Sequence, residues 1–384
     1  MTNPQNFNEL PALKSTFVSD SKQLQTCVQQ LEHSDIIAVD TEFIRTDTFF
    51  PILALVQIFN GENCWLIDPV SVSDLSPLKK LLMSDETLKV FHSCSEDIEV
   101  LSYTLRCCPK PIFDTQIAAA LTGYGFSTGY ASLAKNILGV HIDKGETRSN
   151  WLKRPLSASQ LGYAALDVIY LLPIYFQLKE KLAKLGRKKW IDEEMSRLTE
   201  KASTKEDLSQ YFQKVKGAWR LPSEKLSALQ LICEWREQEA RDKNKPRGRI
   251  IDDKTIIEVV SNATQSREGL SEIKGMHPYL IERYSEKLLD LIKEGFARPA
   301  KEYPAPLSEP LPKHMSSTIK KLKQIVNMKA ELLDIAPEIL ARKKDIEFLV
   351  RSMISEENIR LPDKIAEGWR FDVIGSALLI SSRD

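Results

Sequence analysis

This sequence of 384 residues lacks the features of membrane-spanning, secreted and low-complexity proteins. No uninterrupted apolar run reaches the roughly 18–20 residues that cross a bilayer. The N-terminus, MTNPQNFNELPALKS, has neither the basic region nor the apolar stretch of a secretory signal. With only 15 glycines and 19 prolines, and with 42% hydrophobic residues, the composition excludes a collagenous or disordered chain. The length suits two or three globular domains, and we expect no membrane association.

Metal-binding and disulfide patterns of cysteine are also missing. None of the six cysteines forms a Cys-x-x-Cys motif and the 5 histidines do not cluster, so the sequence gives no support for a zinc site. Scattered thiols in a chain without a secretory signal are typical of a reducing compartment, and we expect a cytoplasmic protein.

The whole chain has no net charge, but each of its halves does. Residues 1–200 hold 24 acidic and 20 basic side chains, whereas residues 201–384 hold 29 acidic and 33 basic ones. The basic second half permits a polyanionic partner without requiring one.

The first half has an α/β pattern with five predicted strands. Apolar runs at 53–59 and 64–67 flank Asn60-Gly61, a strong hairpin signal, so the first three strands should form an antiparallel meander. The predicted strands are 36–39, 53–59, 64–67, 88–91 and 111–113. The predicted helices are 75–83, 95–105, 116–121, 131–138 and 157–185, the last with a capping box at Ser157 and Gln160 and a stop at Gly186.

The second half is predicted to be helical from about residue 210. Five prolines in residues 299–312 indicate an extended linker. At an offset of 90 residues, apolar positions on the two sides of this linker agree, for example Leu229 with Ile319 and Ile256 with Ile346. The agreement predicts two copies of one helical module, although helical periodicity alone could produce part of it.

Three groups of residues are candidates for chemistry. Asp40 and Glu42 alternate along a strand, so they project from one face, where mutual repulsion would favour a hard divalent cation. Such a pair is also common at a solvated strand edge. Asp97 lies in the first turn of a helix, where an acid also complements the helix dipole. Tyr163 and Asp167 share one face of an apolar helix, and a buried Asp there needs a partner.

These groups are spaced as in a known enzyme family. Residues 36–176 resemble DEDD-type 3′–5′ exonucleases of the Tyr-containing subclass, and the layout of the whole chain resembles the ribonuclease D family. The resemblance is carried by Asp40-Thr41-Glu42-Phe43, by His92-x-x-x-Glu96-Asp97 and by Tyr163-x-x-x-Asp167. One departure is Asn150, where the family commonly has Asp; that position is not a metal ligand in the family.

The resemblance implies a fold and a domain organisation. We expect a ribonuclease H-like α/β nuclease domain, with a mixed five-stranded sheet and helices, followed by two all-α HRDC-type domains. The expected boundaries are 1–200 for the exonuclease domain with its core at 14–185, 210–296 for the first HRDC domain, 297–312 for the linker and 313–384 for a second, degenerate HRDC domain.

The resemblance also implies a two-metal mechanism. Asp40, Glu42, Asp97 and Asp167 would bind two divalent ions, Mg²⁺ or Mn²⁺, and Tyr163 would position the attacking water. The implied reaction is hydrolysis of RNA from the 3′ end to 5′-mononucleotides, with tRNA precursors as the expected substrates. We expect a monomer with no obligatory protein partner.

Substrate contacts are predicted for aromatic and basic residues, each with a structural alternative. Phe43 would lie beside the terminal base or in the core, and His92 would contact phosphate or satisfy a helix end. Two basic clusters would follow the RNA backbone or be solvated surface. The first consists of Lys144, Arg148, Lys153 and Arg154 around Trp151, and the second of Lys243, Lys245, Arg247 and Arg249.

Two other functions compete with RNA hydrolysis. A DNA 3′–5′ exonuclease of the proofreading kind would use the same carboxylates. A non-catalytic RNA-binding scaffold would not need all four acids and Tyr163, which argues against it.

Overall fold

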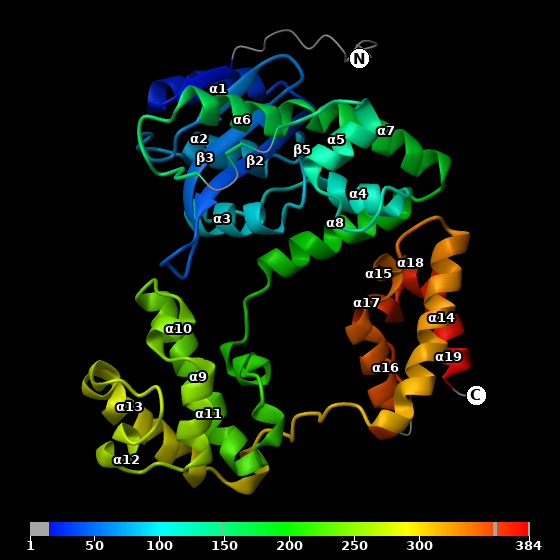
Figure 1. The fold of residues 1–384 in the computed structure, drawn as a ribbon. Helices are drawn as coiled ribbons and strands as arrows, with labels where there is room; N and C mark the ends of the chain where they lie inside the picture. The colour runs from blue at the N-terminus through cyan, green and yellow to red at the C-terminus, as the bar shows by residue number, and fades with distance from the viewer. Residues whose placement is uncertain (1–14, 144, 147–148, 356–358, 383–384) are drawn as a thin grey trace. The chain divides into compact units, whose positions relative to one another are not determined.

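The chain divides into two compact units in the structure, a computed structural model that describes residues 15–143, 145–146, 149–355 and 359–382 (Figure 1). The first unit contains the described residues up to Ile44, Ile52–Thr204 and the described residues from Leu311 onward. The second contains Arg45–Pro51 and Lys205–Pro310. A short segment between two strands of the first unit therefore belongs with the helices of the second.

A mixed six-stranded sheet forms the centre of the first unit, in the order β1-β4-β3-β2-β5-β6. The strands are β1 Ser15–Val18, β2 Ile36–Ile44, β3 Ile52–Phe59, β4 Cys64–Ile67, β5 Leu88–Phe91 and β6 Ile112–Asp114. The antiparallel meander predicted from the sequence is confirmed as β2, β3 and β4, while β1, β5 and β6 pair in parallel.

The expected count of five strands was wrong, because β1 was missed. β1 is four residues long with only Val18 buried, and it pairs with β4, whose residues lie about 50 positions away. A short edge strand of this kind has no local turn signal, and its pairing partner is set by the tertiary fold. The Asn60-Gly61 turn behaves as predicted: Asn60 Oδ1 accepts hydrogen bonds from the N–H groups of Glu62 and Asn63, and Gly61 has a φ of +100°.

Eight helices accompany the sheet among the described residues up to Ser203. They are α1 Ser21–Leu31, α2 Ser76–Met83, α3 Ser95–Leu105, α4 Thr115–Leu121, α5 Tyr130–Leu138, α6 Ala158–Ile169, α7 Leu171–Lys184 and α8 Lys188–Ser203. The capping box of Ser157 and Gln160 is present at the start of α6. The predicted helix 157–185 is interrupted at Tyr170, and α1 and α8 were not predicted.

The stretch Ala158–Lys184 is long and apolar enough as a whole to cross a membrane by length and composition, although it contains no uninterrupted apolar run of that length. More than half of its most apolar window is buried inside the fold. α6 packs against β2, β3 and β4, so the apolar residues of this helix have a partner surface in the core of the first unit.

The second unit is a helical module with its own core. Its helices are η2 Leu208–Lys214, η3 Ala218–Arg220, α9 Ser223–Asp242, α10 Arg247–Ile250, α11 Asp253–Ser261, α12 Arg267–Ser271, α13 Pro278–Ala297 and η4 Ala300–Glu302. α9 and α13 approach closely at Gly295, where an added Cβ would lie 2.4 Å from the Cα of Ala228. Residues 303–312, in the proline-rich stretch, form no helix or strand.

Side chains of α9, α10 and the turn between them hold the segment Arg45–Pro51 against the helical module. Asn244 Oδ1 accepts hydrogen bonds from the backbone N–H groups of Phe49 at 3.0 Å and Phe50 at 2.9 Å. The guanidinium groups of Arg241 and Arg247 lie over the Phe49 ring, at 5.0 and 4.7 Å from its centroid.

The C-terminal helices pack against α8 in the first unit. They are η5 Lys313–Met315, α14 Ser316–Leu332, α15 Pro337–Leu340, α16 Lys343–Ser355, α17 Asp363–Ala366, α18 Gly368–Arg370, η6 Phe371–Gly375 and α19 Ser376–Ser381. Trp369 stacks on Trp190 with ring centroids 4.5 Å apart, and its indole N–H donates to Glu194 at 2.9 Å. Arg370, which is 6% exposed, forms an ion pair with Glu194.

Candidate active site

Asp40 and Glu42 lie on β2, one of the two central strands of the sheet. The preceding residues Ile37, Ala38 and Val39 are fully buried, so β2 brings both carboxylates to the edge of the core. Strand alternation places the two side chains on one face. The register of β2 and β3 shifts between Glu42 and Phe43, at the point where the acidic pair ends.

Asp167 reaches the same place from α6. The capping box fixes the start of this helix, and Asp167 follows Tyr163 by one turn. The Tyr163 hydroxyl hydrogen-bonds to the Asp167 carboxylate, which lowers the pKa of Asp167 against the larger opposing effect of burial.

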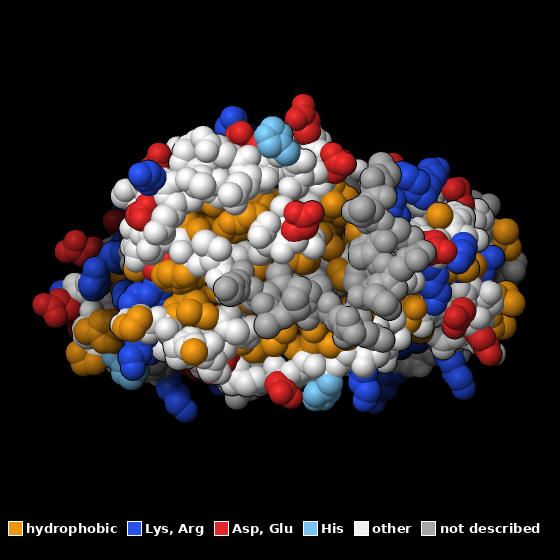
Figure 2. All heavy atoms as spheres, turned by 90° about the horizontal axis from the view of Figure 1, so that it is seen from above, with side chains coloured by type: hydrophobic (Ala, Val, Ile, Leu, Met, Phe, Trp, Pro, Cys, Tyr) orange, Lys and Arg blue, Asp and Glu red, His pale blue; other side chains and the backbone are white. Residues whose placement is uncertain are grey.

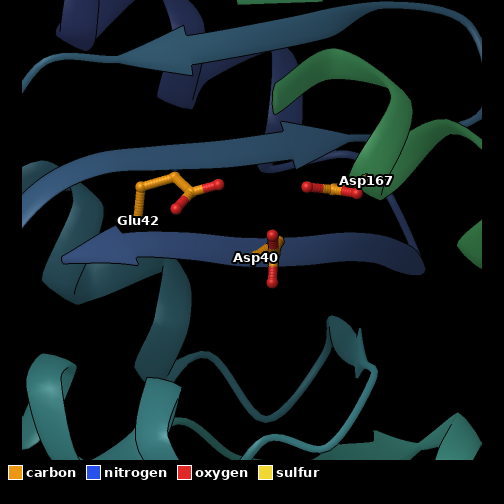
Figure 3. A group of neighbouring side chains, drawn as sticks. All are labelled: Asp40, Glu42 and Asp167. Carbon is orange, nitrogen blue, oxygen red and sulfur yellow. The ribbon is translucent and has the colours of Figure 1, made fainter. Parts of the chain in front are cut away.

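These three carboxylates form one cluster, which Figure 3 shows. One oxygen from each of Asp40, Glu42 and Asp167 lies within 4.8 Å of the other two. The residues come from positions up to 127 apart along the chain, and only the packing of α6 on β2 brings them together.

Asp97, at the start of α3, lies beside this cluster but is not one of the three. Its Oδ1 accepts a hydrogen bond of 2.5 Å from the Thr41 hydroxyl, and Thr41 stands between the two acids of β2. The charge of Asp97 raises the pKa of Asp40, second only to burial, so the fourth carboxylate acts electrostatically on the cluster.

Burial and mutual repulsion make the cluster costly to ionise. The pKa of Asp40 is raised well above its ordinary value, first by desolvation and then by the charges of Asp97, Asp167 and Glu42. Desolvation raises the pKa of Glu42 to about 8, with Asp167 and Asp97 adding to it. Desolvation is also the largest cause of the raised pKa values of Asp97 and Asp167, both about 7. A cation placed among these groups would relieve both effects.

The donor set fits a hard divalent cation. All of these groups offer carboxylate oxygens, which Mg²⁺ and Mn²⁺ prefer. Gln57 pairs directly with Asp40 across β2 and β3 and is fully buried, yet neither its Nε2 nor its Oε1 has a hydrogen-bond partner among the described residues. A buried amide without a partner beside the acids indicates that the site is completed by a further polar species.

Thr41 and Gln57 contribute to the site but were not predicted as site residues from the sequence. The strand register could have found Gln57, since it is the residue opposite Asp40. No sequence signal points to Thr41, because its partner Asp97 is 56 residues away.

His92 lies in the turn before α3 and is held on both sides of its ring. Nδ1 contacts the Thr115 hydroxyl at 2.9 Å, and Nε2 lies 3.1 Å from the Thr128 carbonyl oxygen. Burial lowers the pKa of His92, which favours the neutral imidazole. Phe43 is half-buried and packs against the core.

The basic cluster around Trp151 is only partly described. Arg148 and Lys144 lie outside the described residues. Trp151 is 2% exposed. The Arg154 guanidinium forms an ion pair of 2.5 Å with buried Asp68 and also donates to the Ala54 carbonyl at 2.7 Å.

The second basic cluster lies in the helical module. Arg247 pairs with Glu237, which is 1% exposed, and Lys243 pairs with Glu239. Lys245 and Arg249 are exposed, and Arg249 lies 3.9 Å from Asp47. Three of the four cations therefore already have acidic partners within this unit, and Lys245 has none among the described residues.

Known proteins are similar to this chain over nearly its whole length. A family model described as 3′–5′ exonuclease matches residues 15–183, and one described as HRDC domain matches residues 225–292. Ribonuclease D of Pseudomonas paraeruginosa is 37% identical over 363 residues, which cover 94% of this chain and 96% of that protein. Ribonuclease D of Sphingobium indicum is 35% identical over 364 residues, covering 93% and 92%.

Among solved structures, a ribonuclease D is also similar to nearly the whole chain. The crystal structure of Escherichia coli RNase D, described as an exoribonuclease involved in structured RNA processing, superimposes with a TM-score of 0.87 at 30% identity, over 97% of this chain and 99% of that chain. The catalytic core of RRP6 from Trypanosoma brucei, with a TM-score of 0.59 and 21% identity over 74% of this chain and 80% of that one, is similar in fold alone.

Proposed function

Because this chain belongs to the ribonuclease D family, we propose that the acidic cluster on β2 and α6 is the active site of its exoribonuclease activity. The chain is a hydrolytic 3′–5′ exoribonuclease, with an exonuclease domain followed by a helical HRDC region. The convergence of Asp40, Glu42 and Asp167 within 4.8 Å is the observation that carries the assignment of the site.

The four carboxylates would hold two divalent ions, Mg²⁺ or Mn²⁺. Asp40, Glu42 and Asp167 form the central set, and Asp97 completes it from α3. Such ions, when bound, stabilise the charges that develop on the attacking and leaving oxygens of a phosphodiester. The protein's own part is to hold the carboxylate oxygens in place in a half-buried site.

Tyr163 has a positioning role in this proposal. Its hydroxyl hydrogen-bonds to the Asp167 carboxylate, which holds it where it would orient a water molecule. The presence of Tyr163 one turn before Asp167 supports placing the chain in the Tyr-containing subclass of DEDD exonucleases.

The domain organisation follows the predicted boundaries in this proposal. The exonuclease domain is 1–200 and the first HRDC domain is 210–296. Residues 313–384 are a second, degenerate HRDC copy, supported by the apolar repeat at an offset of 90 residues.

Substrate contacts are proposed for the aromatic and basic residues named from the sequence. Phe43 and His92 would lie nearest the 3′ end, and Arg148, Lys245, Arg247 and Arg249 would meet phosphates farther along the strand. Trp151 and Arg154 would act indirectly, because one is buried and the other is bound to Asp68. The proposed substrates are tRNA precursors, acted on in the cytoplasm by a monomer.

An end-labelled RNA assay tests the function. RNA labelled at its 3′ nucleotide should release labelled 5′-mononucleotide first in the presence of Mg²⁺, and the same RNA with a 3′-phosphate should be resistant. Internal fragments, or release that persists in EDTA, would contradict the proposed mechanism. Competition between RNA and DNA of one sequence would separate an exoribonuclease from a DNA exonuclease, since the carboxylates serve either substrate.

A further inference from the structure

A cavity in the first unit lies between the exonuclease domain and the C-terminal helices. It has a volume of about 420 Å³, within the range of pockets that bind small organic ligands. Its exonuclease wall is formed by the turn before α3, by α4 and the segment that follows it, and by α8, and its other wall by the C-terminal helices from α15 to α18. Acidic and basic side chains are intermingled on the face that Figure 2 shows, so a concentration of one charge in a cavity is informative.

Positive charge dominates the lining of this cavity. Its acidic residues are Asp114, Glu194 and Glu338, and its basic residues are Arg197, Lys201, Arg342, Lys344, Lys364 and Arg370. Six cations against three acids leave a formal charge of +3.

Two of the three acids already have partners. Asp114 accepts hydrogen bonds from four backbone N–H groups at the starts of α3 and α4, at 2.8–3.2 Å. Glu194 is paired with Arg370 and with the Trp369 indole. Among the described residues neither acid forms an ion pair with the other cations that line the cavity.

Four of the cations have no ion pair among the described residues: Arg197 and Lys201 on α8, and Arg342 and Lys344 at the start of α16. The Arg197 guanidinium donates to the Lys364 carbonyl at 2.8 Å, which directs it toward the C-terminal helices. The four cations thus come from both walls, and the C-terminal helices contribute half of them.

The cavity also offers an aromatic surface and polar donors. Phe126 is 38% exposed, and the Arg342 guanidinium lies 5.2 Å from its ring centroid. Ser93, Ser95 and Gln116 line the exonuclease wall. Cations beside an exposed aromatic ring are the combination that binds single-stranded nucleic acid, with phosphates on the charges and a base on the ring.

The cavity is next to the candidate active site along the chain. Ser93 follows His92, and Ser95 precedes Asp97 by two residues on α3. Gln116 Nε2 donates to the Thr128 carbonyl, which His92 also contacts. The turn that carries His92 and leads into α3, where Asp97 lies, therefore also forms part of the cavity wall.

We propose that this cavity binds phosphates of the RNA substrate, upstream of the nucleotide being removed, and that the C-terminal helices serve to complete it. The proposal deepens the proposed function and rests on it for the identity of the strand. The phosphate chemistry would also suit a free mononucleotide, so the test has an arm for each source.

The test measures equilibrium binding by the full-length protein in EDTA, which prevents hydrolysis. The probe is a 5′-fluorescein-labelled single-stranded RNA, and the variant is Arg342→Gln with Lys344→Gln. The matched control is Lys320→Gln with Lys323→Gln, two exposed lysines on α14 that do not line the cavity. Equal urea midpoints for both variants and wild type establish that the fold is retained.

Losing two phosphate contacts should weaken binding about 25-fold at 0.1 M salt and reduce the slope of log K against log salt by about 1.4, since each single-strand contact contributes ~0.7. The control should keep the wild-type slope. Arg197→Gln with Lys201→Gln, on the opposite wall, should reproduce the loss and serves as the test if the first variant does not fold.

Three results would overturn the proposal. The first is an unchanged salt slope in both cavity variants, and the second is an equal loss in the control. The third is loss of affinity for adenosine 5′-monophosphate with unchanged affinity for RNA, which would make the cavity a small-anion site. Binding in EDTA is independent of catalysis, so a failure to hydrolyse RNA would count against the proposed function and not against the cavity.

Discussion

Thr41 Oγ1 donates a hydrogen bond of 2.5 Å to Asp97 Oδ1 and thereby ties β2 to α3. Thr41 stands between Asp40 and Glu42, so the bond fixes the fourth carboxylate relative to the first two. It also lowers the pKa of Asp97, opposing the larger effect of burial. A neutral hydroxyl thus helps to keep a buried acid in the ionised form that a metal requires.

Replacing Thr41 by Val should therefore weaken the site without altering the strand. Val keeps the β-branched shape but removes the donor, so we expect Mg²⁺ affinity and turnover to fall by about 10–100-fold. The Mg²⁺ dependence of RNA hydrolysis measures both. Thr41→Ser, which restores a hydroxyl, should recover most of the loss; if Ser and Val behave alike, the hydrogen bond has no role in catalysis.

Removing a carboxylate should abolish turnover while leaving the fold intact. For Asp40→Ala or Asp167→Ala we expect a loss of at least ~10³-fold, or about 4 kcal/mol of transition-state stabilisation, because both residues belong to the three-carboxylate cluster. Single-turnover hydrolysis of labelled RNA measures the loss, and circular dichroism checks the fold. Asp192→Ala, on an exposed part of α8, is the control. Near-normal nucleotide release by either variant would end the metal assignment.

For Tyr163→Phe we expect a rate loss of about 100-fold or more with substrate binding retained. The change removes only the hydroxyl that bonds to Asp167 and that would orient the attacking water. Single-turnover rate and RNA affinity in EDTA separate the two effects. An unchanged rate would remove Tyr163 from the mechanism.

Thermal stabilisation by Mg²⁺ should increase as the pH rises from 6 to 8. The folded-state pKa values of Glu42, about 8, and Asp97, about 7, are raised by burial above those of the unfolded chain. The metal-free folded state therefore retains protons that the unfolded chain has released, and it loses stability as the pH rises through this interval.

Metal binding needs the deprotonated carboxylates, so Mg²⁺ should raise the melting temperature most at the higher pH, where the metal-free protein is least stable. Melting temperatures with EDTA and with excess Mg²⁺ at pH 6, 7 and 8 measure this difference. Asp40→Asn should reduce both the Mg²⁺ effect and the loss of stability without metal. A Mg²⁺ effect that is independent of pH would contradict the electrostatic account.

The ion pair of Arg370 with Glu194 should be important for stability. Both side chains are largely buried, and removing one partner leaves the other charge without compensation. We expect Arg370→Met to lower the free energy of unfolding by about 3–5 kcal/mol in urea titrations. Glu194→Gln combined with Arg370→Met should recover part of this loss.

Lys188→Met gives a matched control, because Lys188 and Asp192 form an exposed pair on the same helix. Such a pair contributes about 0–1 kcal/mol. If the two Met variants were equally stable, the buried pair would not be what fixes the C-terminal helices to α8.

The sequence by itself determined features that depend on a few neighbouring residues, although it did not reveal β1, α1 or α8. The Asn60-Gly61 turn, the capping box at Ser157 and the alternation of Asp40 and Glu42 depend on a few neighbouring residues, and the structure contains the first two as hydrogen bonds and the third as strand geometry. Turn and cap chemistry act over two to four residues, so the printed order of residues is enough to find them.

The tertiary structure alone decided which distant residues meet. β1 is a strand because it pairs with β4. Thr41 hydrogen-bonds to Asp97, 56 residues away. The packing of α6 brings Asp167 close to Asp40 and Glu42 on β2. Only that packing aligned the cations of α8 with those of α16 around one cavity. Such contacts are selected by burial and shape over the whole core, and no short stretch of sequence contains that information.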